Sequence, residues 1–88
     1  MPRISTFHGM TIAIYYNDHL PPHIHIAFSG FITRIEIETG EYMRGNEALP
    51  RAKEKIVLKW LDTYNNDIMK AWDDCMAKRQ PKKVPPLS

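Results

Sequence analysis

The first half of the chain alternates apolar and polar residues with a period of two. Within residues 10–16, and again within residues 23–28, the even positions carry the large apolar side chains. A period of two places successive side chains on opposite faces of a β-strand. Turn residues separate these runs at 8–9, 17–22, 29–30 and 39–40. We therefore expect an antiparallel β-meander of about four strands over residues 3–43.

From Pro50 onward the period changes to that of an α-helix. Proline suits a first helical turn, and apolar residues then recur at helical spacing between Ile56 and Met76. The stretch 65–67, Asn-Asn-Asp, interrupts good helix formers and predicts a kink or a break. We expect an amphipathic helix or a broken helix pair over residues 50–79. It should cover the apolar face of the sheet, which gives an α+β fold.

Length and composition limit the chain to one small domain. Its 88 residues are 43% hydrophobic and 25% charged, and we place the α+β domain at residues 1–79. Residues 80–88 mix lysines with prolines, which predicts a disordered basic tail. The chain lacks an apolar run of about 18 residues, and its only cysteine is Cys75. We expect a cytoplasmic protein with no membrane segment.

The segment from Asn17 to His25 is chemically unusual, because it holds three of the four histidines around a proline pair. Proline fixes φ and lacks an N–H group, so the loop through Pro21 and Pro22 should hold His19 in a restricted place. His23 and His25 lie two positions apart and therefore share one face of their strand.

A two-residue turn at Ser29–Gly30 fixes the register of the two strands beside it. In this register His25 lies opposite Arg34, and His23 lies opposite Glu36. One imidazole therefore neighbours a cation and the other a carboxylate.

The parity of the apolar faces also favours Tyr16 opposite Ile24, which would put Tyr15 beside His25. The solvated face of the sheet should then carry an exposed patch with Asp18 at its rim. The patch consists of Tyr15, His19, His23, His25, Arg34 and Glu36.

One chemistry that could use this patch is metal binding. His19, His23 and His25 could ligate zinc, manganese, iron or nickel, with a carboxylate from Asp18 or Glu36. The fixed charge nearby at position 34 opposes a second cation and suits an anionic ligand instead.

A second chemistry is acid–base catalysis or anion binding. His23, oriented by Glu36, could act as a general base while His25 and Arg34 stabilise a developing anion. Asp18, His19, Tyr15 and Arg34 are then the candidates for ligand binding. A third interpretation assigns no site at all, because histidines on a solvated strand face are often ordinary surface residues.

Several stretches of the chain resemble a small bacterial family, domain of unknown function 4160. The most specific is the string Asp-His-x-Pro-Pro-His-x-His at 18–25, and weaker matches are at 4–9, 36–41, 49–51 and Trp60. The resemblance implies a cytoplasmic α+β domain, often encoded beside another small protein in pairs that resemble toxin–antitoxin modules. A shared function would use Asp18, His19, Pro21, Pro22, His23 and His25.

Two functional hypotheses follow. In the first, the chain is the binding component of a toxin–antitoxin-like two-gene module. Its histidine-rich sheet face would contact the neighbouring gene's protein, an anionic ligand or nucleic acid. In the second, it is a small hydrolase or nuclease that uses His23, His25 and Glu36, with or without a divalent metal. Open strand edges would also allow a homo-oligomer.

Overall fold

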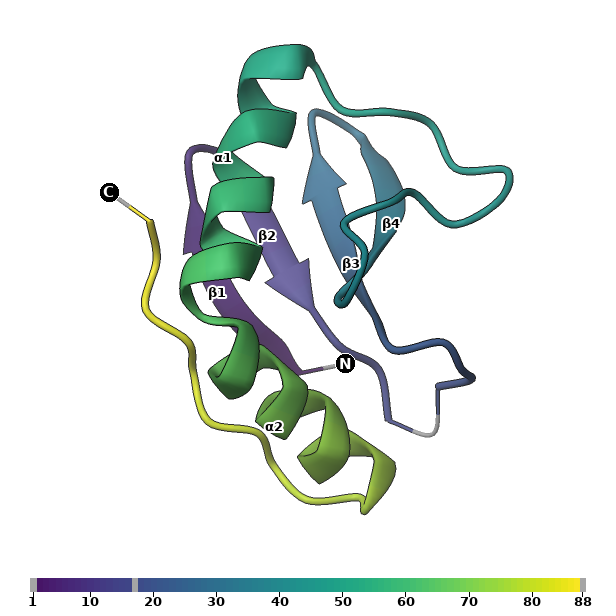
Figure 1. The fold of residues 1–88 in the computed structure, drawn as a ribbon, viewed down its shortest axis with the longest axis vertical. Coiled ribbons are helices and arrows are strands. Elements are labelled where there is room, and N and C mark those ends of the chain that lie inside the picture. Colours follow the sequence, from purple (N-terminus) through teal and green to yellow (C-terminus); the bar gives the residue numbers. More distant parts are fainter. Residues whose placement is uncertain (1, 17, 88) are drawn as a thin grey trace.

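The computed structural model describes residues 2–16 and 18–87 (Figure 1). Met1, at the start of the predicted domain, Asn17, at the start of the histidine segment, and Ser88, at the end of the predicted tail, lie outside the described residues.

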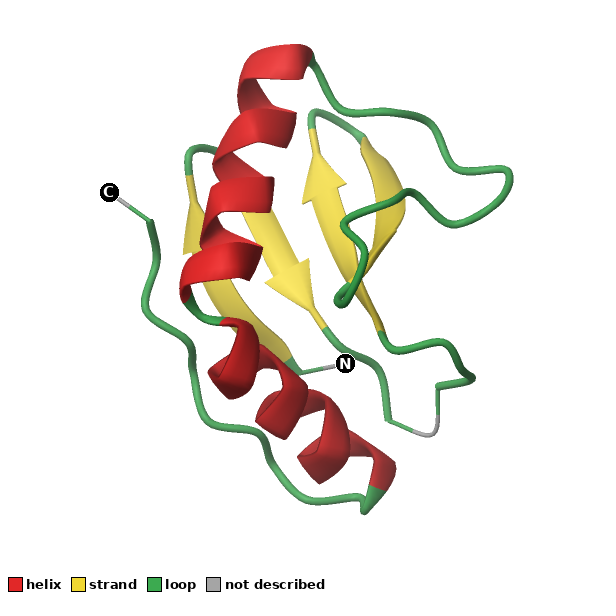
Figure 2. Cartoon of the chain, in the orientation of Figure 1, coloured by secondary structure: helices red, strands yellow, loops and turns green. Residues whose placement is uncertain are grey.

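The structure is a four-stranded antiparallel sheet covered by two helices, which confirms the expected α+β meander (Figure 2). The helices lie over the same face of the sheet, and the opposite face has no helix over it. The strands follow chain order across the sheet. Their bounds are β1 Arg3–Phe7, β2 Met10–Ala13, β3 His23–Phe28 and β4 Phe31–Glu36, and those of the helices are α1 Arg51–Thr63 and α2 Asn65–Met76.

Two-residue turns join β1 to β2 and β3 to β4. In the second turn Ser29 and Gly30 both have positive φ, at 47° and 88°. Two positive φ values in succession produce the tight turn that suits the twist of a hairpin. The predicted register between β3 and β4 is confirmed, with His25 opposite Arg34 and His23 opposite Glu36.

The register between β2 and β3 differs from the expected one by two residues. Ala13 pairs with His25, and β2 ends there, so Tyr16 lies outside the ladder and is exposed. The predicted pairing of Tyr16 with Ile24 was wrong. A shift of two residues keeps every side chain on the same face, and the apolar pattern therefore cannot distinguish the two registers.

The core lies between the inner face of the sheet and the helices. The predicted break in the helical segment is confirmed, and it falls at Tyr64, whose backbone N–H bonds to the carbonyl of Trp60. The break lets both helices bury an apolar stripe against one sheet. The fully buried side chains include Ile4, Met10, Ile12, Ile24, Ile26 and Ile35 from the sheet, Ile14 just after β2, and Val57, Trp60 and Ile68 from the helices.

The final segment packs against the domain, although the sequence predicted a disordered tail. The backbone N–H of Val84 donates to the carbonyl of Ile4 at 2.7 Å, and the indole of Trp60 donates to the carbonyl of Pro85 at 2.8 Å. Figure 1 shows this segment running beside β1. Composition alone suggested disorder, but Val84 is apolar and buried, and β1 has an open edge that can accept a hydrogen bond.

No helix in the described part of the chain is long and apolar enough to cross a membrane.

The packing of Val84 leads to a stability prediction. Val84→Ala should lower the free energy of unfolding by about 2 kcal/mol, because it leaves a cavity beside the core. The control is Lys82→Ala, which changes an exposed residue of the same segment and should alter stability by less than about 0.5 kcal/mol. Urea denaturation measures both variants. Equal stability of the two would show that the segment does not dock on the domain.

Candidate functional site

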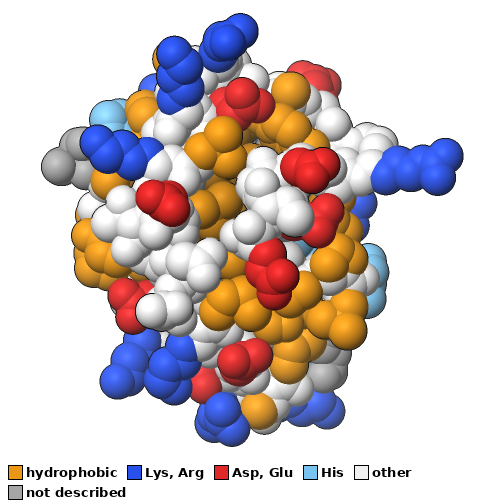
Figure 3. Space-filling model, viewed as in Figure 1, with side chains coloured by type: hydrophobic (Ala, Val, Ile, Leu, Met, Phe, Trp, Pro, Cys, Tyr) orange, Lys and Arg blue, Asp and Glu red, His pale blue; other side chains and the backbone are white. Residues whose placement is uncertain are grey.

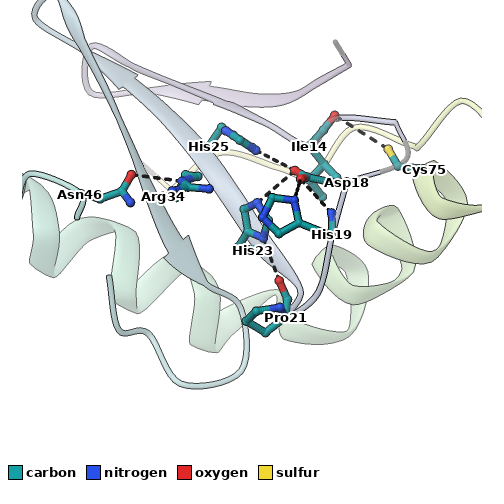
Figure 4. A network of polar contacts seen from close by, with 9 residues as sticks. All are labelled: Ile14, Asp18, His19, Pro21, His23, His25, Arg34, Asn46 and Cys75. Atoms are coloured by element: carbon teal, nitrogen blue, oxygen red, sulfur yellow. Dashed lines mark hydrogen bonds and ion pairs between the residues drawn. The ribbon is translucent and has the colours of Figure 1, made fainter. Parts of the chain in front are cut away.

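The histidine segment folds back on itself at one end of the sheet. His23 and His25 lie on β3, whereas Asp18 and His19 lie in the loop that enters this strand. The loop turns so that the Asp18 carboxylate points at the imidazoles, as Figure 4 shows. The sequence placed Asp18 at the rim of a patch, but the structure places it at the centre of the cluster.

Asp18 contacts all three histidines of the segment. Its Oδ2 atom lies 2.8 Å from Nε2 of His25 and 3.0 Å from Nε2 of His23. Its Oδ1 atom accepts a hydrogen bond from the backbone N–H of His19 at 2.9 Å and lies 3.3 Å from the Nδ1 atom of the same residue. One carboxylate therefore faces two imidazole nitrogens through a single oxygen.

His23 is fully buried, at 0% exposure, although the sequence predicted an exposed side chain. Its ring lies 5.4 Å from that of Trp72 on α2 and 5.0 Å from that of His25, measured between centroids. Strand alternation shows which face a residue takes, but not what covers that face. Here the neighbouring loop and α2 close over the start of β3.

The hydrogen bond at Nδ1 of His23 determines which nitrogen is available for other contacts. Nδ1 lies 2.7 Å from the carbonyl oxygen of Pro21. A carbonyl oxygen can only accept, so Nδ1 carries a proton and donates it. In a neutral imidazole this leaves the lone pair on Nε2, the atom that faces Asp18.

The Nε2 atom of His23 is buried and has no hydrogen-bond partner among the described residues. It lies 3.0 Å from Oδ2 of Asp18, but the angles do not meet those of a hydrogen bond. A buried polar atom without a partner is costly, and two lone pairs that face each other repel. The pair of atoms therefore favours a cation that contacts both of them.

His25 is held by a stacking contact and a hydrogen bond. Its ring stacks on Tyr15 with 3.8 Å between the centroids and 2° between the planes. Tyr15 and His25 therefore lie side by side as predicted, although the register between β2 and β3 differs from the predicted one. Burial lowers the pKa of His25, the hydrogen bond to Asp18 raises it in part, and Arg34 lowers it further. At neutral pH the ring is therefore neutral and donates from Nε2 to Asp18.

Asp18 is ionised at neutral pH. Burial raises its pKa, but the hydrogen bonds from His25 and from the backbone of His19, together with the nearby imidazoles, outweigh this and lower it below the usual value. The site therefore contains a fixed negative charge beside the Nε2 atom of His23, which has no hydrogen-bond partner in the described part of the chain.

Arg34 and Glu36 lie on the outer face of β4, as expected. The Nε–H group of Arg34 donates to the side-chain oxygen of Asn46 at 3.2 Å. Asn46 follows in the loop after β4, where the sequence shows no pattern that would have identified it. Glu36 is opposite His23 in the register, yet no hydrogen bond or ion pair joins these two described residues. The expected orientation of His23 by Glu36 is wrong, since Pro21 and Asp18 take that place.

The donor atoms of Asp18, His23 and His25 all lie within 4.8 Å of one another. Bonds of about 2.1 Å to a metal place adjacent ligand atoms about 3.0 Å apart in octahedral geometry and about 3.4 Å apart in tetrahedral geometry. The two contacts of Asp18, at 2.8 and 3.0 Å, are within a few tenths of an ångström of the octahedral separation and are shorter than the tetrahedral one. Small side-chain rotations would thus admit an ion.

His19 is the expected metal ligand that lies outside this group. Its side chain is 73% exposed, and its ring centroid is 5.7 Å from that of His23. The histidine that the structure leaves at the surface is therefore His19, whereas His23 is the most deeply buried of the three.

The family model described as "Domain of unknown function (DUF4160)" matches residues 9–73, which include the whole histidine segment. The chain therefore belongs to this family, as the resemblance indicated. No curated protein and no solved structure matches the chain.

The burial of His23 leads to a second prediction. His23→Ala should lower the free energy of unfolding by about 3 kcal/mol, because it removes a buried ring and leaves the Pro21 carbonyl without its donor. The matched variant His19→Ala changes an exposed imidazole and should cost less than about 0.5 kcal/mol. Thermal and urea unfolding of the metal-free protein measure both. If His23→Ala were as stable as His19→Ala, His23 would lie at the surface.

Proposed function

We propose that this DUF4160 domain binds one divalent metal ion through Asp18, His23 and His25. The observation that carries the proposal is the buried Nε2 atom of His23, which faces a carboxylate oxygen and has no hydrogen-bond partner among the described residues. The Nδ1 atom of the same ring is bound to a backbone carbonyl. Metal-ligating histidines commonly have such a partner on the second nitrogen, since it fixes the tautomer and orients the ring.

A proton on Nε2 of His23 is the alternative cation. It would create a buried imidazolium beside the Asp18 carboxylate, and the attraction within such a pair offsets only part of the cost of removing both charges from water. It would also need an N–H direction aimed at Oδ2, and the present angles are not those of a hydrogen bond. A metal ion set between the two atoms satisfies both lone pairs without that alignment.

Ligation by His25 requires a change of tautomer. Its Nε2 atom now donates to Asp18, whereas a metal ligand must present a lone pair there. The proton would move to Nδ1, and this change is a spectroscopic signature of binding. Two imidazoles and one carboxylate suit zinc, iron, nickel or manganese, and they leave further coordination positions for other ligands.

Titration of the chelator-treated full chain with Co²⁺ and Zn²⁺ tests the metal site. We expect one equivalent of Co²⁺ to produce visible absorption bands, and Zn²⁺ to displace it and move the ring ¹⁵N signals of His23 and His25. His25→Gln should weaken binding at least about 100-fold, because it removes a ligand. The control His8→Asn changes the exposed histidine of the first turn and should bind normally.

The metal proposal fails if the wild type shows no saturable binding. It also fails if His25→Gln binds the metal ion as tightly as His8→Asn does, since the ion would then bind elsewhere on the surface. Because His25 is only partly buried, this variant keeps the test independent of the folding defect expected for His23 substitutions.

We further propose that the domain uses this centre as the binding component of a toxin–antitoxin-like two-gene module. The proposal rests on the family resemblance, and one feature of the site loop supports it. Leu20 and Tyr16 are 73% and 40% exposed on either side of Asp18. These two side chains would offer apolar area for contact with another protein.

Co-expression with the protein encoded by the neighbouring gene tests this role. We expect the two proteins to co-purify, and Leu20→Asp to abolish co-purification because it places a charge in the apolar contact. Leu58→Asp, which changes a partly exposed leucine on α1, is the matched control and should leave the complex intact. Failure of the wild-type pair to co-purify would contradict the binding role.

The hydrolase or nuclease alternative uses the same centre differently. A divalent ion with free coordination positions can act as a Lewis acid toward an ester. In that case His23 and His25 would be ligands rather than general bases. The Glu36 side chain, which forms no hydrogen bond or ion pair with either histidine among the described residues, would have no part in orienting His23.

A further inference from the structure

Arg34 is a neighbour of His25, a residue of the candidate metal centre, and it is hydrogen-bonded to the loop after β4. It is opposite His25 in the register, on the face of the sheet that the helices leave open. Its Nε–H group donates to Asn46, whose amide group in turn donates to the carbonyls of Met43 and Arg44 at 3.1 and 3.2 Å. The guanidinium is therefore oriented by the loop after β4, and its terminal N–H groups donate to no other side chain or carbonyl among the described residues.

Arg34 has no carboxylate partner in the described part of the chain. It takes part in none of the ion pairs among the described residues. The carboxylate of Glu36, two residues further on the same face, is not paired with the guanidinium either. A half-buried arginine usually pairs with an anion, because its fork of N–H donors matches the oxygens of a carboxylate or a phosphate.

Binding of a metal ion would make this surface positive. An ion of charge +2 together with Arg34 outweighs the carboxylates of Asp18 and Glu36, since His23 and His25 are neutral as ligands. An anion that bridges the guanidinium and the ion would offset the repulsion between these two cations.

Little of the candidate metal centre is exposed to solvent. Asp18 and His25 have side-chain exposures of 8% and 12%, His23 is covered, and Tyr15 closes one side of the His25 ring. A compact group can reach such a covered site more readily than an extended chain can. A tetrahedral oxyanion can direct different oxygens at the ion and at the arginine.

We infer that Arg34 and the metal centre together form a subsite for the terminal phosphate group of a small molecule. This inference rests on the proposed metal function and specifies its ligand. Asn46 is the positioning residue that aims the guanidinium. His25 is opposite Arg34 in the register and is hydrogen-bonded to Asp18, so it connects the two residues.

A cavity elsewhere in the described part of the chain supports no proposal of its own. The cavity of about 280 Å³ between α1 and the turn after β4 is lined by Ile37, Leu58 and Leu61, with Glu38 and Asp62 at its rim. Figure 3 shows apolar and acidic side chains on the face of the molecule that carries the helices. Nothing in this cavity points to a particular occupant.

Binding of methylphosphonate, a phosphate analogue that is not hydrolysed, tests the inference. We would titrate it by calorimetry into the metal-loaded and metal-free full chain. Arg34→Gln should weaken binding to the loaded protein at least tenfold, while its affinity for Co²⁺ stays equal or rises. Arg34→Lys should retain part of the affinity, because the charge remains and the fork is lost. Arg44→Gln, an exposed arginine of the same loop, is the matched control.

Acetate in place of methylphosphonate identifies the chemistry of the anion. The inference predicts weaker binding of acetate, which has only two oxygens to share between the ion and Arg34. Equal affinity for acetate would overturn the assignment to phosphate. Equal binding of methylphosphonate by the wild type and Arg34→Gln would overturn the subsite itself, even where Co²⁺ binds.

The metal function and the subsite can fail separately. Without metal binding, methylphosphonate affinity that still depends on Arg34 would support the subsite and contradict the metal function. With metal binding, the absence of any methylphosphonate binding would overturn the subsite and leave the metal function standing.

Discussion

The hydrogen bond between Nδ1 of His23 and the carbonyl of Pro21 is the interaction on which the site depends. It fixes the tautomer of a buried ring and directs the other nitrogen at Asp18. Because the prolines at 21 and 22 stiffen the loop, the carbonyl that accepts this hydrogen bond is held in place. The carboxylate and the unpartnered nitrogen then form a site that favours a cation, and the remaining contacts of the cluster complete it.

The fold places this interaction at a protected end of the sheet. The sheet supplies His23 and His25 on one face of β3, and α2 contributes Trp72 against the His23 ring. The outer face stays open beside His25, so the site is closed on one side and reachable on the other. A small domain can build such a site because the loop before β3, rather than a second domain, provides the cover.

Much of the fold could be predicted from periodicity and turn chemistry. The turn at Ser29–Gly30 was sufficient to pair His25 with Arg34, because a two-residue turn leaves only one register. The burial of His23 could not be predicted, since alternation does not reveal what packs over a strand. The central place of Asp18 depends on the path of an irregular loop. Composition also failed to predict that the final segment packs on the domain through Val84, because this packing depends on the free edge of β1.

Anomalous diffraction at the zinc absorption edge, on crystals grown with one equivalent of Zn²⁺, tests the central claim most directly. The account predicts a single strong peak about 2.1 Å from Oδ2 of Asp18 and from the Nε2 atoms of His23 and His25. A peak only at the exposed His8 or His19, with the hydrogen bond from His25 to Asp18 still in place, would contradict it.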